Sequence, residues 1–591
     1  MKFSEQLTTW LAQLGYTHCF FVPGGNSMHL LDGARTRMSC VPFVHEMSAT
    51  IAAEYFNETQ KSSKAYVLLT AGPGLTHAIS GIAGAYLEGR ELLVIGGQVK
   101  TSDLATDGLR QRGIQEIDGT SLVKSITKYT ERLLEPIDFR SLVTKIQKQF
   151  DDKPGPVFLE IPLDVQGAQV EPEITESYRE VPDSRKTELS DGDLKYVISL
   201  LEEARRPILL LGGGVARDQE FISNAIDAIG IPTMTTYNGT DRLGSNSPLY
   251  FGRPNTWGMR YSNVLIAQAD VIIAVGSRLG LQQTGFNFKG FAPNARIVQV
   301  DLDLTELTKG HPVIDRGVRS DGLTFLRGLA ENHHWTDIDS WIDFCHEVKE
   351  LLPLSEETNS SHDGFWNPYD FLLEISEVAS SEDVVIPCSS GGSFTAFYQA
   401  FQNKTGQVIA SDKSLASMGY GLAGAIGAAL ANSDKRVLHI EGDGGFSQNL
   451  QELATVSVQK LKIKSFLWCN EGYASIRMTQ RNYFDGKYLG CDTSSGLGFP
   501  DWHKLGDAYG IPVVELNPGF RNEPEVMAHL KADGPALFIV KIHPEQTFFP
   551  KIMSRITPNG SMESEPLWDI SPKLEENLKE RVLSRATFSI E

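Results

Sequence analysis

RVLHIEGDGGFSQNLQELATVSVQKLKIKSFLWCNEGY, residues 436–473, has the pattern of a strand, a helix and a second strand. The apolar run from Val437 to Glu441 predicts a strand, which the small residues of Gly442–Gly445 end in a turn. Apolar residues on one face predict a helix over 448–459, and Ile463–Trp468 is a second apolar run. A strand–helix–strand unit of this length forms a right-handed parallel crossover, so this stretch predicts a parallel α/β sheet.

Two polar residues follow these strands. Asp443 comes after the first strand and Asn470 after the second, so both lie at the carboxyl edge of the sheet, where such sheets bind ligands. A carboxylate, an amide oxygen and the backbone carbonyl of Gly472 offer three ligands to Mg²⁺, which takes the others from water and phosphate. The glycines beside Asp443 let backbone N–H groups approach phosphate oxygens. The alternative is an ordinary Gly-Asp turn, but the Asn at the end of the next strand favours a metal–phosphate site.

GDGGF and the later CNEGY together resemble the fingerprint of thiamine diphosphate enzymes, which begins with Gly-Asp-Gly and usually ends in Asn-Asn. Cys469 stands at the first Asn, whereas the metal ligand of the family is the second, which matches Asn470. The resemblance implies thiamine diphosphate and Mg²⁺ as cofactors, with Asp443, Asn470 and Gly472 as metal ligands. It implies that cofactor contacts in this part of the chain come from Ser389, Ser390, Met418, Gly442, Asp443, Gly444, Gly445, Asn470, Gly472 and Tyr473.

The first 170 residues contain four short apolar runs that end in small or polar residues, the pattern of another parallel sheet. The order VPGG, VHEMSATIAAEYF and TAGPG resembles the pyrimidine-binding domain of the acetolactate synthase group. Glu46 matches that group's catalytic glutamate, which bonds the cofactor's pyrimidine and helps it lose its C2 proton. A helix-start charge is the alternative role for this carboxylate. The same resemblance implies that His77 and Gln115 line the reaction space and that Pro23, Gly24, Gly25 and Gly72 contact the cofactor.

The middle of the chain predicts a third parallel α/β unit. RRPILLLGGGVARD (205–218) is strand, glycine turn and helix, but Arg217 stands at the third glycine of a dinucleotide fingerprint. Arg278, Thr284 and Gly285 match a pattern in the FAD-holding central domain of acetolactate synthases. FAD, another nucleotide and an empty scaffold all remain open for this unit.

A chain of 591 residues is too long for one core. The expected fold is α/β, with three doubly wound parallel-sheet domains: pyrimidine-binding (1–170), central (190–345) and diphosphate-binding (365–550), followed by a C-terminal extension (551–591). Polar stretches at 171–193, 333–341 and 353–368 are predicted linkers, and Ser571-Pro572 is expected to start a last helix.

Composition narrows the class of protein. Hydrophobic residues make up 41% and charged residues 22%, and the net charge of −20 argues against nucleic-acid binding. The N-terminus lacks a secretory signal, and no apolar run reaches the ~18 residues of a membrane span. Six scattered cysteines without a CxxC pair are typical of free thiols, so a cytoplasmic protein is expected.

The resemblance implies decarboxylation of a pyruvate-like 2-oxo acid with carboligation to a second carbonyl compound. A decarboxylase that releases an aldehyde is the alternative. A non-catalytic scaffold is another, although a decayed site would be expected to have lost Glu46, Asp443 or Asn470. In the family, the pyrimidine domain of one subunit faces the diphosphate domain of another, which implies a homodimer or homotetramer.

Three residues depart from the branched-chain amino-acid enzymes. Leu163 replaces a Lys, Ile114 replaces a Phe, and Thr479 replaces a Trp. The stretches SIRMTQRNYFDG and QQTGFN are more similar to synthase-like proteins of surface-polysaccharide sugar pathways. The resemblance therefore implies a different acceptor from that of the branched-chain enzymes.

Overall fold

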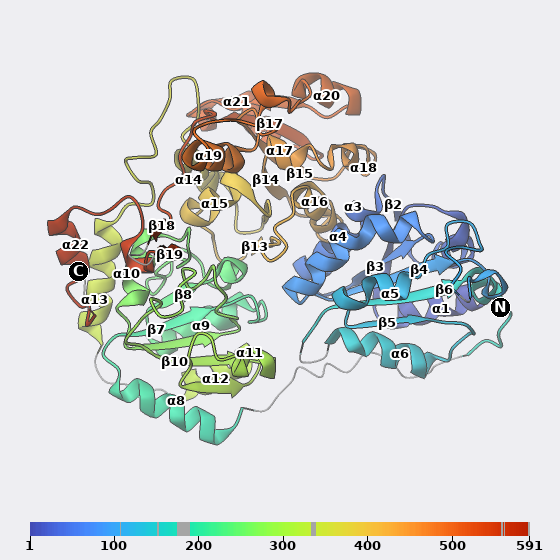
Figure 1. Cartoon of the computed structure of the whole chain (residues 1–591), viewed down its shortest axis with the longest axis horizontal. Helices are drawn as coiled ribbons and strands as arrows, with labels where there is room; N and C mark the ends of the chain where they lie inside the picture. Colours follow the sequence, from blue (N-terminus) through green and yellow to red (C-terminus); the bar gives the residue numbers. More distant parts are fainter. Residues whose placement is uncertain are drawn as a thin grey trace. The chain divides into compact units, whose positions relative to one another are not determined.

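The computed structural model describes residues 1–591 except Asp107, 151–152, 174–188, 333–337, 557–559, 561 and 589–591. Three parallel sheets, each with helices packed around it, follow one another along the chain (Figure 1), as the sequence predicted. The contacts divide the chain into two compact units: one contains Met1–Ser184, Asp383–Gly391 and Ala410–Val540, and the other contains Arg185–Glu382, Gly392–Ile409 and Lys541–Glu591.

The N-terminal sheet has six parallel strands in the order β2-β1-β3-β4-β6-β5. Its strands are β1 (Tyr16–Phe21), β2 (Ser39–Pro42), β3 (Lys64–Leu69), β4 (Leu92–Gln98), β5 (Tyr129–Arg132) and β6 (Pro156–Pro162). The helices are α1 (Phe3–Gln13), α2 (Met28–Ala34), α3 (Glu46–Thr59), α4 (Pro73–Glu88), α5 (Gly119–Val123), α6 (Phe139–Gln147) and α7 (Leu163–Gly167). Helix α4 begins at Pro73, because a proline fits the first turn of a helix.

The C-terminal sheet has the order β13-β12-β14-β15-β17-β16. Its strands are β12 (Val384–Pro387), β13 (Val408–Ile409), β14 (Val437–Gly442), β15 (Ile463–Cys469), β16 (Val513–Glu515) and β17 (Ala536–Lys541). Strands β14 and β15 are parallel neighbours, with Gly442 opposite Trp468. This register brings Asp443 and Asn470 to the same edge, as predicted.

The helix predicted over 448–459 is broken. The structure has α17 (Asp443–Phe446), the 3₁₀ turn η6 (Leu450–Glu452) and α18 (Leu453–Val458) instead. Side chains in this region bind distant backbone: Asn449 donates to the Gly419 carbonyl at 2.7 Å, and Glu452 accepts from the His45 N–H at 2.9 Å. These contacts fix the course of the backbone over 443–458, and the spacing of apolar residues alone did not predict the break in the helix.

The remaining helices of the C-terminal half of the chain are α14 (Pro368–Val378), α15 (Gly391–Ala400), α16 (Tyr420–Ala431), α19 (Ala474–Tyr483), α20 (Trp502–Tyr509) and α21 (Pro524–Lys531). Helix α16 packs directly on α3 (Figure 1). A Cβ on Gly427 would lie 2.0 Å from the Ala52 carbonyl oxygen, and one on Gly424 would lie 2.8 Å from the Tyr55 ring. The small residues of α16 therefore allow this close helix contact.

A buried cluster of charges lies near this contact. Arg90 donates to Glu54 and to the Ser411 carbonyl, both at 2.7 Å. The second oxygen of Glu54 and one oxygen of Asp412 are buried, and no described residue donates to either. Burial, opposed by Arg90 and reinforced by Asp412, raises the pKa of Glu54 from 4.5 to about 8.

This shift predicts a pH dependence of stability. A carboxyl whose pKa is raised in the folded state takes up a proton on folding, so its contribution is complete below about 4.5 and is lost as the pH rises towards 8. We expect the apparent melting temperature to fall between pH 5 and pH 8 less steeply in Glu54→Gln than in the wild type. The control is Glu91→Gln, at a partly buried carboxylate paired with Lys64 at 3.4 Å, and it should keep the wild-type slope. Equal slopes in all three proteins would contradict the prediction.

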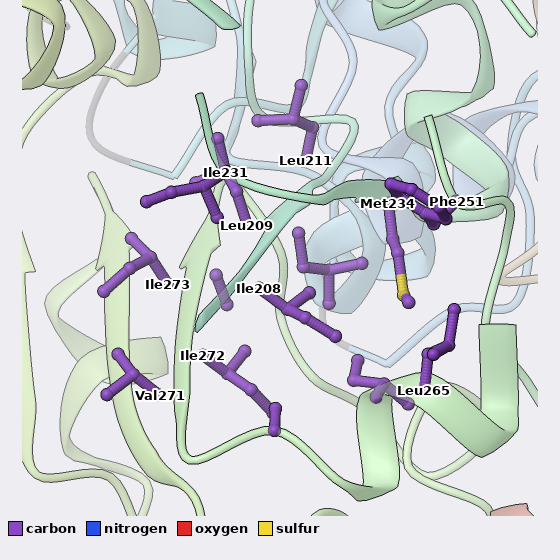
Figure 2. Close-up of a cluster of buried hydrophobic side chains, with 14 of the residues drawn as sticks. Ile208, Leu209, Leu211, Ile231, Met234, Phe251, Leu265, Val271, Ile272 and Ile273 are labelled. Carbon is purple, nitrogen blue, oxygen red and sulfur yellow. The ribbon is translucent and has the colours of Figure 1, made fainter. Parts of the chain in front are cut away.

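The central sheet has the order β11-β10-β9-β7-β8. Its strands are β7 (Pro207–Leu211), β8 (Thr233–Thr235), β9 (Val271–Val275), β10 (Arg296–Asp301) and β11 (Arg316–Arg319). Its helices are α8 (Asp191–Glu203), α9 (Gln219–Ile229), α10 (Arg260–Ala267), α11 (Leu304–Thr308), α12 (Gly322–Glu331) and α13 (Asp339–Leu351). Figure 2 shows part of its core, where Ile208, Ile272 and Leu265 are buried together.

The predicted linkers at 171–193 and 333–341 each overlap the start of a helix of the central domain. Residues 174–188 of the first linker and 333–337 of the second lie outside the described residues, whereas 191–193 begin α8 and 339–341 begin α13. The second linker is therefore shorter than predicted, because Trp341 and Phe344 are buried in the central core.

The C-terminal extension packs on the central core through Leu567, Val582 and Leu583. It contains the short antiparallel strands β18 (Ser554–Ile556) and β19 (Met562–Ser564), the 3₁₀ turn η9 (Leu567–Asp569) and α22 (Glu576–Val582). The prediction that Ser571 starts the last helix is wrong. Its N–H and carbonyl are paired with the backbone of Lys551 at 2.9 and 3.0 Å, so the helix begins at Glu576.

Among the described helices, none has the length and apolar composition of a membrane span. All six cysteines lie in the described residues and none of them forms a disulfide.

Candidate active site

Asp443 lies at the end of β14, 2% exposed. Its Oδ1 accepts from the Gly444 N–H at 2.8 Å, and its Oδ2 accepts from the N–H groups of Asn470 and Glu471 at 3.0 and 2.9 Å. Burial raises the pKa of Asp443 to about 7, against the effect of these N–H donors and of Arg477. A divalent cation bound to this carboxylate would stabilise its ionised form, which burial disfavours.

Asn470 follows β15 and is buried. No described residue donates to its Oδ1. An amide oxygen is a normal ligand of a hard cation. Buried polar atoms almost always have a partner, so a buried oxygen without one indicates a missing partner such as an ion. This unpartnered oxygen beside a buried carboxylate fits the predicted Mg²⁺ site.

The next residues adjoin the same turn. Gly472 has a φ of +156°, and its carbonyl accepts from the Ala474 N–H at 3.1 Å; a carbonyl has a second lone pair for a cation. The Tyr473 ring lies on Gly444, where a Cβ would be 2.4 Å from the ring. A Cβ on Gly445 would be 2.7 Å from Glu441, so both glycines of the turn are required by close neighbours.

The segment after β12 and the segment before α16 are joined by a hydrogen bond. The Ser389 hydroxyl donates to the Ser417 carbonyl, which ties the end of β12 to the residue before Met418. Met418 is partly buried just ahead of α16, and Ser390 is partly buried beside Ser389. Their contact with a diphosphate remains a prediction.

Glu46 is the first residue of α3 and is 8% exposed. The His77 Nδ1 lies 3.0 Å from its Oε2. The His45 and His77 rings are stacked, with centroids 4.8 Å apart, and the His45 Nδ1 accepts from the Met47 N–H at 3.2 Å. The structure thus brings Glu46 and His77 together, so that the imidazole can exchange a proton with the carboxyl group.

The predicted glycines of this domain are also close-packed. A Cβ on Gly24 would lie 2.4 Å from the Thr70 side chain, and one on Gly72 would lie 2.3 Å from the Gln115 carbonyl oxygen. Gly72 has φ +61° and Gln115 has φ +62°, so Gln115 is held against the turn that starts α4. Pro23 and Gly25 are exposed.

Sequence reasoning missed Glu452. It is fully buried and its carboxylate accepts from the N–H groups of Val44 and His45, at 3.4 and 2.9 Å. Burial raises the pKa of this carboxyl above its usual value. Glu452 holds the backbone directly before Glu46; a lone Glu within the apolar run LQELATV was the available signal.

Glu116, next to Gln115, was also missed. Its buried carboxylate accepts from the N–H groups of Ala105, Arg112 and Gly113. Burial opposes its ionisation, but these three N–H donors outweigh burial and lower its pKa. Glu116 thus organises the loop that precedes Gln115.

The glycine turn of the central domain is occupied by its own chain. Gly212 and Gly214 donate their N–H groups to the carbonyls of Val275 and Gly276, at 2.8 and 2.9 Å. A Cβ on Gly212 would lie 2.1 Å from the Gly276 carbonyl oxygen. A pyrophosphate has to approach the backbone of such a turn closely, and here Gly212 and Gly214 are packed against Gly276.

Two arginines close the same turn. Arg242 donates to the carbonyls of Gly213 and Val215, at 3.1 and 2.6 Å. Arg217 donates to Asp241 at 2.6 Å, which explains why an Arg can stand at the third glycine position. The glycine turn does not fit a dinucleotide phosphate.

Two of the three residues that match the FAD pattern, Thr284 and Gly285, are packed against other parts of the chain. Thr284 is buried and donates to the Gly280 carbonyl at 3.1 Å. A Cβ on Gly285 would lie 3.0 Å from Leu567, and Arg278 is exposed.

Comparison with known proteins supports the N- and C-terminal domains as cofactor-binding. Three models of thiamine pyrophosphate enzymes match: the N-terminal TPP binding domain at 1–122, the central domain at 194–329 and the C-terminal TPP binding domain at 390–540. The chain is 28% identical to acetolactate synthase 1, chloroplastic, of Zea mays over 94% of its own length and 87% of the relative's. It is also 28% identical to the acetolactate synthase large subunit of Cyanidium caldarium, over 86% of each chain. With all three domain models of one family matched in order, the chain belongs to the thiamine pyrophosphate enzymes and is acetolactate synthase-like.

Proposed function

We propose that this enzyme uses thiamine diphosphate and Mg²⁺ to decarboxylate a pyruvate-like 2-oxo acid and joins the remaining fragment to a second carbonyl compound. The observation that carries the metal assignment is the unpartnered Asn470 Oδ1 beside the buried carboxylate of Asp443. The carboligation rests on similarity to acetolactate synthases.

The residues of the site would have three roles: metal binding, pyrimidine binding and proton transfer. When bound, thiamine diphosphate supplies the nucleophilic carbon and the electron sink that loss of CO₂ requires. Asp443, Asn470 and the Gly472 carbonyl would hold Mg²⁺, which neutralises the diphosphate. Glu46 would bond the pyrimidine from a site with little water, where a carboxylate competes well for a proton. His77, half-exposed and bonded to Glu46, would move a proton between that carboxyl group and solvent.

Product analysis tests the reaction. The purified protein is incubated with thiamine diphosphate, Mg²⁺, a panel of 2-oxo acids and candidate carbonyl acceptors, including keto sugar nucleotides, and the products are identified by mass spectrometry. A product with the mass of the acceptor plus the decarboxylated fragment is expected. Free aldehyde as the sole product would favour the simple decarboxylase, and an unchanged mixture in all combinations would overturn the proposal.

We further propose that the central domain acts without a flavin, since its glycine turn binds its own backbone. The purified protein should show no flavin absorbance near 450 nm, and added FAD should leave the rate unchanged. Stoichiometric FAD after purification, or a rate that depends on FAD, would contradict this proposal.

We also propose a homodimer or homotetramer, as the resembled family implies. Large apolar side chains are exposed near both halves of the site, among them Ile114 (81%) and Leu489 (80%), and a second copy could cover them. Sedimentation at assay concentration should give at least a dimer. A monomer with full activity would refute the assembly.

A further inference from the structure

Arg477 lies behind the turn that carries Asn470. It is on α19 and is 3% exposed. Its guanidinium donates to the Asn470 carbonyl at 3.2 and 3.3 Å and to the Glu471 carbonyl at 3.1 Å. The backbone of this turn is therefore held from two sides, because its N–H groups bind Asp443 and its carbonyls bind Arg477.

The turn needs this support. Glu471 has φ +62°, a left-handed conformation that is unfavourable for a residue with a side chain. A Cβ on Gly472 would lie 2.2 Å from the Cys491 carbonyl oxygen. The turn is thus pressed against residues 491–492 in a conformation that its own sequence does not favour.

Asp492 balances the charge of Arg477. Its Oδ2 accepts from the Arg477 Nε at 3.2 Å, and its Oδ1 accepts from the hydroxyls of Ser494 and Ser495 at 2.8 and 2.7 Å. The Asp492 carboxylate thus lies directly beside the buried guanidinium and offers it an opposite charge.

We propose that Arg477, charge-balanced by Asp492, is a positioning residue that holds the Asn470 turn so that the Asn470 Oδ1 and the Asp443 carboxylate face the same divalent cation. This inference rests on the proposed function. Arg477 acts through the two carbonyls that it binds, those of Asn470 and Glu471. Residues that orient metal ligands in this way typically change metal affinity about 10- to 100-fold when they are replaced.

Mn²⁺ binding tests the inference. Mn²⁺ is titrated into the full-length protein with saturating thiamine diphosphate and followed by electron paramagnetic resonance. We expect Arg477→Met to raise the half-saturating Mn²⁺ concentration about 10- to 100-fold, with activity recovering at high Mn²⁺. Arg477→Lys should give a smaller rise, because an ammonium is a point charge without the guanidinium fork.

Lys464 offers a matched control on β15. It is 1% exposed, and its Nζ donates to the carbonyls of Ala532 and Gly534 at 2.9 and 2.8 Å. Lys464→Met also removes a buried cation from two carbonyls, but away from Asn470. It should lower the melting temperature while keeping the wild-type Mn²⁺ half-saturation.

A wild-type half-saturation in Arg477→Met, or an equal rise in Lys464→Met, would overturn the inference. If Arg477→Met does not fold, Arg477→Lys and Asp492→Asn decide in the same way: a rise supports the inference, and wild-type values overturn it. Failure of the proposed function is distinguishable, since then the wild type would bind no Mn²⁺, or Asp443→Ala would bind it equally well.

Discussion

Asp443→Ala should bind no measurable thiamine diphosphate in calorimetric titrations with Mg²⁺ that give clear binding for the wild type. Asp443 is the buried carboxylate of the proposed metal site, and the diphosphate would lose the ion that neutralises it. Removing one partner of a buried charge pair costs about 3–5 kcal/mol, on the order of 100- to 5000-fold in affinity.

Asn470→Ala should have a smaller effect on cofactor affinity than Asp443→Ala. It removes one neutral ligand and leaves the carboxylate, so cofactor affinity should fall less than in Asp443→Ala. Glu91→Gln, away from the turn, should bind like the wild type. Unchanged affinity in Asp443→Ala would remove the metal assignment.

Glu46→Gln should lower kcat far more than it weakens cofactor binding. The substitution keeps the shape of the side chain and removes the charge that faces His77. In the ground state one hydrogen bond of about 1.5–3 kcal/mol is at stake, which limits the loss of affinity to roughly one to two orders of magnitude. A proton-transfer group contributes about 10²- to 10⁴-fold to rate, and an interaction that is stronger along the reaction path appears in kcat.

Steady-state rates at saturating cofactor and direct titration separate these two effects. A fall in affinity with an unchanged kcat would make Glu46 a binding group only. A wild-type value for both would leave it as a helix-start charge.

The strands around the site could be predicted because their sequences are mainly apolar and end in small or polar residues. Strands β14 and β15 are buried on both faces, which favours mainly hydrophobic sequence, although His439 and Lys464 lie within them. Their parallel pairing then follows from the length of the crossover, and with it the common edge of Asp443 and Asn470.

Contacts between distant residues could not be predicted in this way. Glu452 binds backbone more than 400 residues earlier, and that contact helps to break the helix expected over 448–459. Arg477 was seen only as part of a resembling stretch, although its guanidinium holds the carbonyls of Asn470 and Glu471. Both side chains act on backbone groups, which leave no pattern in side-chain spacing.

The last helix shows the limit of local signals. Ser571-Pro572 has the residue types of a helix start, yet Ser571 pairs with Lys551. A tertiary backbone contact overrode the local preference, and α22 starts four residues after the proline.

Exchange of the cofactor's C2 proton tests the central claim, that Glu46 activates thiamine diphosphate held by the Asp443–Asn470 site. The measurement quenches the complex in D₂O at short times and follows the C2 proton by NMR, with the cofactor fully bound. The wild type should exchange this proton much faster than free thiamine diphosphate does. Glu46→Gln should bind the cofactor yet exchange far more slowly than the wild type, whereas exchange at the wild-type rate in that variant would contradict the account.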